Sequence, residues 1–268
     1  LSCSLGASSI YIPVVSSLEK PSTDPLYSTN HEHFSIDSTE YAWYLQQINA
    51  TSVWNITKGS EDIVVAIIDS GIDFSHPEIS HARWKNENKE NEYGWDFVNH
   101  EPITEAGISG PYHYHGTFIS GIIAASHNTS LKVAGIAPHV KLMDLRVLNE
   151  NNKQATAAFG GAIYYAVDNG ADVINLSLGN YADSHFLRKE IAYAYENEVP
   201  LVSVTGNTLL SAGGGANMPS FPGTYDEVIS VGATNYFYEK ADYSNYGNWT
   251  ELVAPVGDQA SSTINHII

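Results

Sequence analysis

The sequence predicts an α/β fold in which a doubly wound parallel sheet carries helices on both faces. Short continuous runs of β-branched and aliphatic residues, such as IVVAII at 63–68 and VINLSL at 173–178, are typical of strands buried on both faces. Helical segments of 10–15 residues alternate with these runs, as right-handed βαβ crossovers require. With 268 residues and 43% hydrophobic composition, the chain can bury one large core.

The expected elements follow one another from residue 41, after an N-terminal arm or linker at 1–40. Residues 16–40 are polar and contain Pro21 and Pro25, whereas 1–15 resemble either the tail of a signal peptide or a disordered terminus. An amphipathic stretch at 41–53 opens the globular domain, which we place at 41–268. The expected strands are 63–68, 141–147, 173–178, 201–205 and 228–231, and the expected helices are 118–126, 155–168 and 188–198. A polar insertion at 81–112 interrupts this alternation.

Charge and apolar run length restrict the partners. The chain has 30 acidic and 12 basic residues, a formal net charge of −18. Nucleic acids and anionic membrane surfaces are bound by basic patches, so we expect neither as a partner. No run of 18 apolar residues occurs, so we expect no transmembrane segment.

The cysteine and the glycosylation sequons bear on location. A single cysteine, Cys3, excludes an intrachain disulfide. Of the N-x-[ST] sequons, Asn175 lies inside an expected buried strand. The other four lie outside expected strands, at Asn49, Asn55, Asn128 and Asn248. We expect a secreted or cell-surface monomer.

Three polar residues lie where active groups gather in open α/β sheets, at the carboxyl ends of strands and the helix starts beside them. Asp69 directly follows the strand 63–68 and precedes Gly71. His115 precedes a helix of small and apolar residues, and Asn207 follows the strand 201–205. Each has an ordinary structural interpretation, as a helix N-cap or a turn residue. Their order and shared placement favour a common site.

These residues lie in motifs that resemble the subtilisin-like serine proteases. The segments VVAIIDSGIDFSHPEI, HGTFISGIIAA, VAGIAP, VINLSLG, TGN and VISVGATN occur in that family's order over about residues 41–268. The resemblance implies a serine endopeptidase acting on polypeptides without an organic cofactor. It implies Asp69 as the triad aspartate, His115 as the general base and Asn207 as the oxyanion-hole donor. It also implies that Ser177, Leu178 and Gly179 pair with an extended substrate.

The nucleophile serine of the family has no counterpart in the chain. The stretch LVAP at 252–255 that precedes it is present, but no Gly-Thr-Ser segment follows before Ile268. Ser261 and Ser262 fall too early and lack the glycine turn. We expect the serine to lie beyond the chain end, so that these 268 residues alone are inactive.

The resemblance also makes a structural Ca²⁺ site a candidate. Glu78 matches a carboxylate ligand of the family, and the loop 127–133 matches the segment that adds oxygen ligands. Thr129 stands where the family has asparagine, which argues against the site. The candidate ligands are Glu78, His127, Thr129, Leu131 and Val133.

Two alternatives to a protease remain. One is a catalytically inactive relative that binds extended peptides through 177–179. The other, a nucleotide-binding domain, is disfavoured because neither GxGxxG nor GxxxxGK[ST] follows an expected strand.

Overall fold

The computed structural model describes residues 43–110, 112–127, 134–151, 153, 158–207 and 217–258, all within the unit that runs from Ile36 to Ile268. Its centre is one sheet with the strand order β3-β2-β4-β1-β5-β6-β7-β8, parallel throughout except for the antiparallel pair β2–β3. The strands are β1 Val64–Asp69, β2 Gly94–Asp96, β3 Glu101–Pro102, β4 Lys141–Arg146, β5 Val173–Leu176, β6 Leu201–Val204, β7 Val228–Thr234 and β8 Leu252–Pro255.

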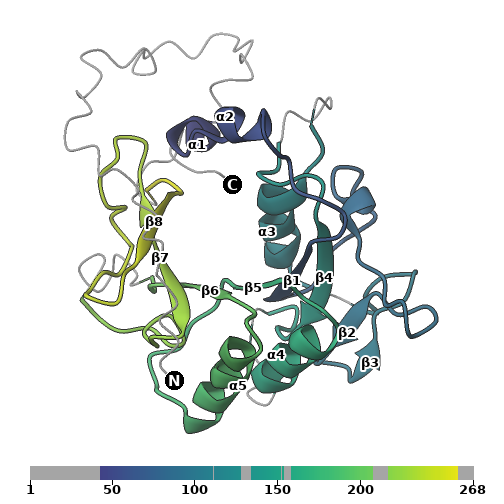
Figure 1. The fold of residues 1–268 in the computed structure, drawn as a ribbon. Coiled ribbons are helices and arrows are strands. Elements are labelled where there is room, and N and C mark those ends of the chain that lie inside the picture. Colours follow the sequence, from purple (N-terminus) through teal and green to yellow (C-terminus); the bar gives the residue numbers. More distant parts are fainter. Residues whose placement is uncertain are drawn as a thin grey trace, which may run out of the picture. The chain divides into compact units, whose positions relative to one another are not determined.

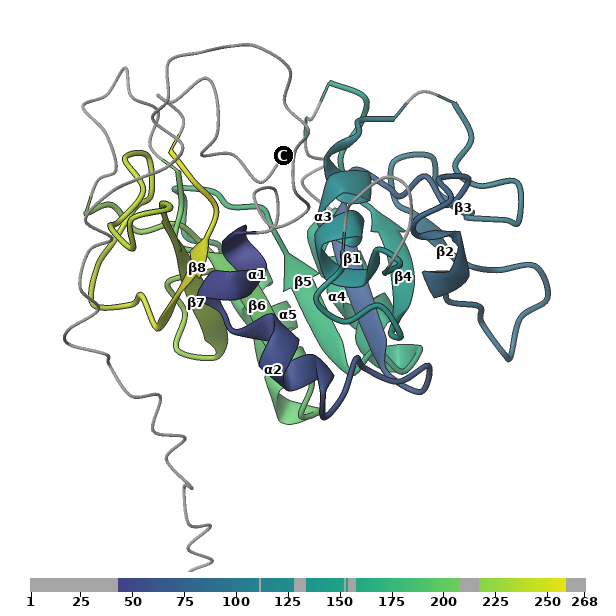
Figure 2. The same ribbon diagram turned by 90° about the horizontal axis from the view of Figure 1, so that it is seen from above.

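Helices cover both faces of this sheet, as the sequence predicts. In Figure 1, α4 and α5 lie below the sheet, whereas α1, α2 and α3 lie above it. Seen from above, α3 lies over β1 and β4 (Figure 2). The helices are α1 Trp43–Gln47, α2 Ala50–Trp54, α3 His115–Ala124, α4 Ala158–Asp168 and α5 His185–Glu196, with a 3-10 turn, η1, at Ser80–Ala82.

Adjacent residues of the central strand show why the sheet is buried on both faces. Ile67 packs in a cluster with Ala124 at the end of α3, whereas Ile68 packs in another with Ile163 of α4. Both isoleucines are fully buried. Alternate side chains of β1 therefore enter two different cores, which is the reason for its unbroken apolar run. The doubly wound α/β architecture is confirmed.

The boundaries of several elements differ from those expected. The helix α3 begins at His115, three residues before Phe118, so the histidine belongs to its first turn. The stretch 41–53 forms two short helices, with Asn49 in the left-handed region (φ 55°) between them. The insertion 81–112 contributes β2 and β3, which the sequence analysis missed because strands of 3 and 2 residues carry no period. Strand β8 was also missed, and the expected helix residues 155–157 lie outside the described part.

The parallel arrangement brings three strand ends to one edge of the sheet. Asp69 is the last residue of β1, Ser177 follows β5, and Thr205 follows β6. These strands are neighbours in the sheet and run in the same direction. Within the described residues, no helix has the length and apolar character that crossing a membrane requires.

Candidate active site

Asp69 is a fully buried carboxylate at the end of the central strand. Its main-chain oxygen accepts hydrogen bonds from the N–H groups of Val147 (2.7 Å) and Leu148 (3.2 Å), which fix the strand end. The N–H of Ser70 donates to Oδ1 at 2.7 Å. A buried carboxylate must be paired and hydrogen-bonded to remain charged, and both conditions depend on the groups around it.

His115 supplies the main partner of that carboxylate. Its Nδ1 lies 2.9 Å from Oδ1 and 2.9 Å from Oδ2 of Asp69. An ionised carboxylate only accepts hydrogen bonds, so Nδ1 carries the proton and Nε2 of the neutral ring is left to accept one. The hydrogen bond that His115 donates to Asp69 raises the pKa of His115 above 6.5, although burial opposes this. About a third of the imidazole surface (34%) remains exposed.

A serine hydroxyl connects the segments that carry these two residues. Ser70 Oγ donates to the carbonyl of His113 at 2.8 Å and accepts the N–H of Gly116 at 3.0 Å. The contact is so close that a Cβ at Gly116 would lie 2.5 Å from the carbonyl oxygen of Gly71. Gly71 itself has φ +100°, a backbone conformation that favours glycine. The motifs DSG and HGT thus build one junction, a role of Ser70 that no local sequence signal indicated.

Asn207 lies at the same edge of the sheet, three residues after the end of β6. Its side chain is exposed. Its main chain is held by an antiparallel bridge to Ser244 and by the Tyr181 hydroxyl, which donates to the Asn207 carbonyl at 2.9 Å.

The segment Ser177–Gly179 continues β5 at this edge. Ser203 Oγ lies 3.4 Å from the carbonyl oxygen of Leu178 and donates to that of Leu176 at 3.0 Å. Gly179 packs against Ser220, whose hydroxyl a Cβ would overlap. The segment is therefore anchored to β6 through Ser203. Asn180, which follows Gly179, forms an antiparallel bridge with Phe221, which follows Ser220.

The described part of the candidate calcium site contains one unsatisfied acidic oxygen. Glu78 is 4% exposed, and its Oε2 has no hydrogen-bond partner among the residues described. The Glu78 carbonyl accepts the N–H of Ser126 at 2.9 Å, beside the start of the loop. The imidazole Nε2 of His127 donates to the Gly135 carbonyl at 2.9 Å. The oxygen that His127 could offer to a cation is that of its main-chain carbonyl. The other candidates, Thr129, Leu131 and Val133, lie outside the described residues.

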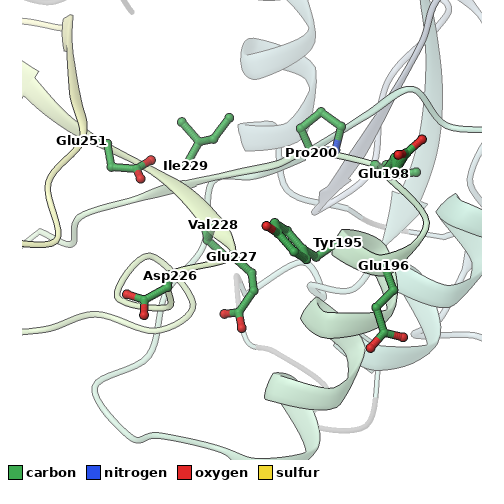
Figure 3. Close-up of a pocket in the computed structure, with 10 residues that line it drawn as sticks. Tyr195, Glu196, Glu198, Pro200, Asp226, Glu227, Val228, Ile229 and Glu251 are labelled. Atoms are coloured by element: carbon green, nitrogen blue, oxygen red, sulfur yellow. The ribbon is translucent and has the colours of Figure 1, made fainter. Parts of the chain in front are cut away.

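A cavity of about 540 Å³ lies at the opposite edge of the sheet (Figure 3). It is formed by the end of α5 and the amino ends of β6, β7 and β8, away from Asp69 and His115. Five carboxylates line it, from Glu196, Glu198, Asp226, Glu227 and Glu251. No sequence motif predicts a site there, and active groups in open α/β sheets gather at the carboxyl ends of the strands, on the other side.

The chain is similar to known proteins over most of its length. Residues 60–267 match the model of the subtilase family, peptidase S8. The chain is 33% identical over 224 residues to a thermophilic serine proteinase of Bacillus sp. (strain AK1), covering 83% of this chain and 51% of that protein. It is 32% identical over 229 residues to thermitase of Thermoactinomyces vulgaris, covering 85% and 74%.

A solved structure, that of a lanthipeptide protease, superposes with a TM-score of 0.66 at 26% identity, covering 85% of this chain and 65% of that one. The chain thus spans only about half of the Bacillus proteinase and just under two thirds of the lanthipeptide protease. The family match covers most of the chain and includes both motif segments of the Asp69–His115 junction. The chain belongs to the subtilase family of serine proteases.

Proposed function

We propose that this chain carries the aspartate and the histidine of a serine endopeptidase that cleaves extended polypeptides. The observation that carries the proposal is the Asp69–His115 hydrogen bond at 2.9 Å, with the imidazole partly exposed at the carboxyl edge of the sheet. We propose that the third triad member, a serine, lies beyond Ile268.

The roles follow from the chemistry of each group. His115 would take the proton of the serine hydroxyl at Nε2 as the oxygen attacks the scissile carbonyl, and then return it to the leaving amine. Asp69 would hold the tautomer with the proton on Nδ1 and stabilise the imidazolium. The Asn207 amide would donate to the developing oxyanion. Ser177, Leu178 and Gly179 would pair with the substrate backbone as an added strand.

The test uses a form of the protein that extends past Ile268 and includes the serine. We expect hydrolysis of an unfolded protein substrate, blocked by a serine-directed acylating reagent and abolished by His115→Ala. Asn197→Ala, at the C-cap of α5, is the control and should leave hydrolysis unchanged. Hydrolysis that survives both the reagent and His115→Ala would refute the mechanism.

The alternative is an inactive relative that binds peptides through the Ser177–Gly179 segment. A longer form that binds an extended peptide, shows no hydrolysis and contains no Gly-Thr-Ser segment would establish this alternative.

We further propose that Glu78 holds a structural Ca²⁺. The Oε2 of Glu78 has no hydrogen-bond partner within the described part of the chain, and a buried carboxylate oxygen of this kind is a suitable ligand for a hard cation. A bound ion would neutralise the buried charge of Glu78 and tie its segment to the loop that begins at His127.

We propose a secreted or cell-surface location, supported by the exposure of three of the sequon residues. Asn49, Asn55 and Asn248 are exposed, whereas Asn175 lies within β5. Glycans found on these positions in the protein from its native source would support secretion, and unmodified asparagines together with an intracellular location would contradict it.

A further inference from the structure

Asp144 is a fully buried acid in the middle of β4, beside the central strand. It is in register with Ile67 of β1 and with Gly94 of β2. Its Oδ2 accepts one hydrogen bond, from the N–H of Ile72 at 3.0 Å. Its Oδ1 has no hydrogen-bond partner in the described part of the chain. A buried carboxyl with one unpaired oxygen costs free energy relative to an apolar side chain of the same shape. A gain in stability therefore does not explain why an aspartate occupies position 144.

The amide that Asp144 holds belongs to the loop that follows Asp69. Ile72 is three residues beyond Asp69, and on the other side of the loop Asp73 is bound through its N–H to Thr117 Oγ1 of α3 at 2.9 Å. Ser70 is bound to the segment before α3 as described above. The loop is thus attached to the helix of His115 at two points, and Ile72 is where a side chain of the sheet holds it.

Other ionisable groups lie around Asp144, but burial has the largest influence on its protonation. Asp96 and Arg146 are also buried and form an ion pair with Nη1 and Oδ2 2.8 Å apart. Among the residues that the structure describes, Arg83 and Tyr112 also interact electrostatically with Asp144. Burial raises the pKa of Asp144 to about 8, so its carboxyl is mostly protonated at neutral pH and still accepts the Ile72 N–H.

We propose that Asp144 is a positioning residue for the Asp69–His115 pair, acting through its hydrogen bond to the Ile72 amide. The bond fixes the loop from the sheet side while α3 fixes it from the other. The carboxylate of Asp69 is thereby held where both of its oxygens reach His115 Nδ1. The inference deepens the proposed function, because the pair it positions is the one assigned there.

The test measures the pair directly by NMR on the chain as it is, without need of peptidase activity. In the wild-type protein we expect a far-downfield resonance for the His115 Nδ1 proton and a raised pKa for the ring. Asp144→Leu removes the acceptor and nearly keeps the shape. It leaves the Ile72 N–H without this partner, so we expect some loss of stability, and a dispersed NMR spectrum checks that the protein is folded. In that variant we expect the downfield resonance to be lost and the pKa of His115 to move down toward 6.5.

Two further variants complete the test. Asp144→Asn keeps an oxygen acceptor for Ile72 and should retain both the resonance and the raised pKa. Asp172→Ala is the matched control, because Asp172 likewise accepts one backbone N–H, that of Val64 at 2.8 Å, which lies at the amino end of β1. It should leave both readouts unchanged.

A folded Asp144→Leu protein with the wild-type resonance and pKa would overturn the proposal, as would loss of both signals in Asp144→Asn. Because the readout is spectroscopic, failure of the proposed protease activity would leave this result standing.

Discussion

His115 Nδ1 lies 2.9 Å from each carboxylate oxygen of Asp69, although the two residues are 46 positions apart in the sequence. The aspartate is fully buried and the histidine is partly exposed. This pairing links the stability of the fold to pH, because it raises the pKa of His115 in the folded state only.

Replacing Asp69 should change how stability depends on pH. A histidine whose folded pKa lies above its unfolded value of 6.5 stabilises the fold fully below pH 6.5, and this contribution is lost as pH rises through the folded pKa. We therefore expect Asp69→Asn to destabilise the protein more at pH 5.5 than at pH 9, as measured by urea unfolding. Asp172→Asn is the control and should show a pH-independent loss. Equal losses at both pH values for Asp69→Asn would contradict the assignment.

Asp144 predicts a second pH dependence that can be separated from the first. Its pKa is raised from 3.8 to about 8, so the folded state binds a proton that the unfolded state has released. The free energy of unfolding should fall as pH rises from about 4 to about 8, by at most about 1.4 kcal/mol per unit. Asp144→Asn should remove this slope while the His115 contribution remains. Parallel stability curves for the two proteins would show that Asp144 does not titrate in this range.

The close approach of α3 to the Asp69 loop predicts opposite effects for two glycines of one helix. Gly116→Ala places a Cβ 2.5 Å from the Gly71 carbonyl oxygen and should cost roughly 1–3 kcal/mol. Gly121→Ala meets nothing within 4 Å and should stabilise the helix by about 1 kcal/mol. Thermal unfolding of both variants measures the difference. A neutral Gly116→Ala would mean that the junction is looser than it appears.

Asn207→Ala in a serine-containing form tests the proposed oxyanion donor. Removing one such donor typically lowers kcat by about 10²–10³ and leaves KM little changed, because the interaction exists only in the transition state. Steady-state kinetics on a peptide substrate give both constants. A rise in KM with unchanged kcat would assign Asn207 to ground-state binding instead.

The proposed calcium site is tested by thermal unfolding with and without a chelator. Binding to the folded state stabilises it by mass action, so chelation should lower the wild-type Tm by a few degrees. Glu78→Gln should begin at the lower Tm and show no response to added calcium. Glu87→Gln removes an exposed acid from the 81–112 segment and should respond like the wild type. An identical calcium response in Glu78→Gln would exclude Glu78 as a ligand.

Local patterns in the amino-acid sequence were sufficient to predict the parallel sheet and the edge at which its polar residues meet. A run such as IVVAII predicts a strand buried on both faces from its own composition, because β-branching and the absence of polar alternation are properties of the run itself. The position of Asp69 at a strand end and of His115 beside a helix start followed from that pattern. Their pairing was implied by the resemblance of their motifs to those of the subtilisin-like proteases. Strands β2 and β3 could not be predicted, because two or three residues carry no period. Their hydrogen bonds depend on pairing, of β2 with β4 and of β3 with β2.

The groups that fix the Asp69–His115 pair in place became visible in the folded chain alone. In the sequence, Asp144 is one of several polar residues in the strand KLMDLRV. The neighbouring residues do not indicate that it is fully buried or that it accepts the N–H of Ile72, 72 residues away. The hydroxyl of Ser70 likewise joins two segments that are distant in the chain. Burial and side-chain hydrogen bonds across such separations depend on how whole elements pack, and local propensities contain no information about them.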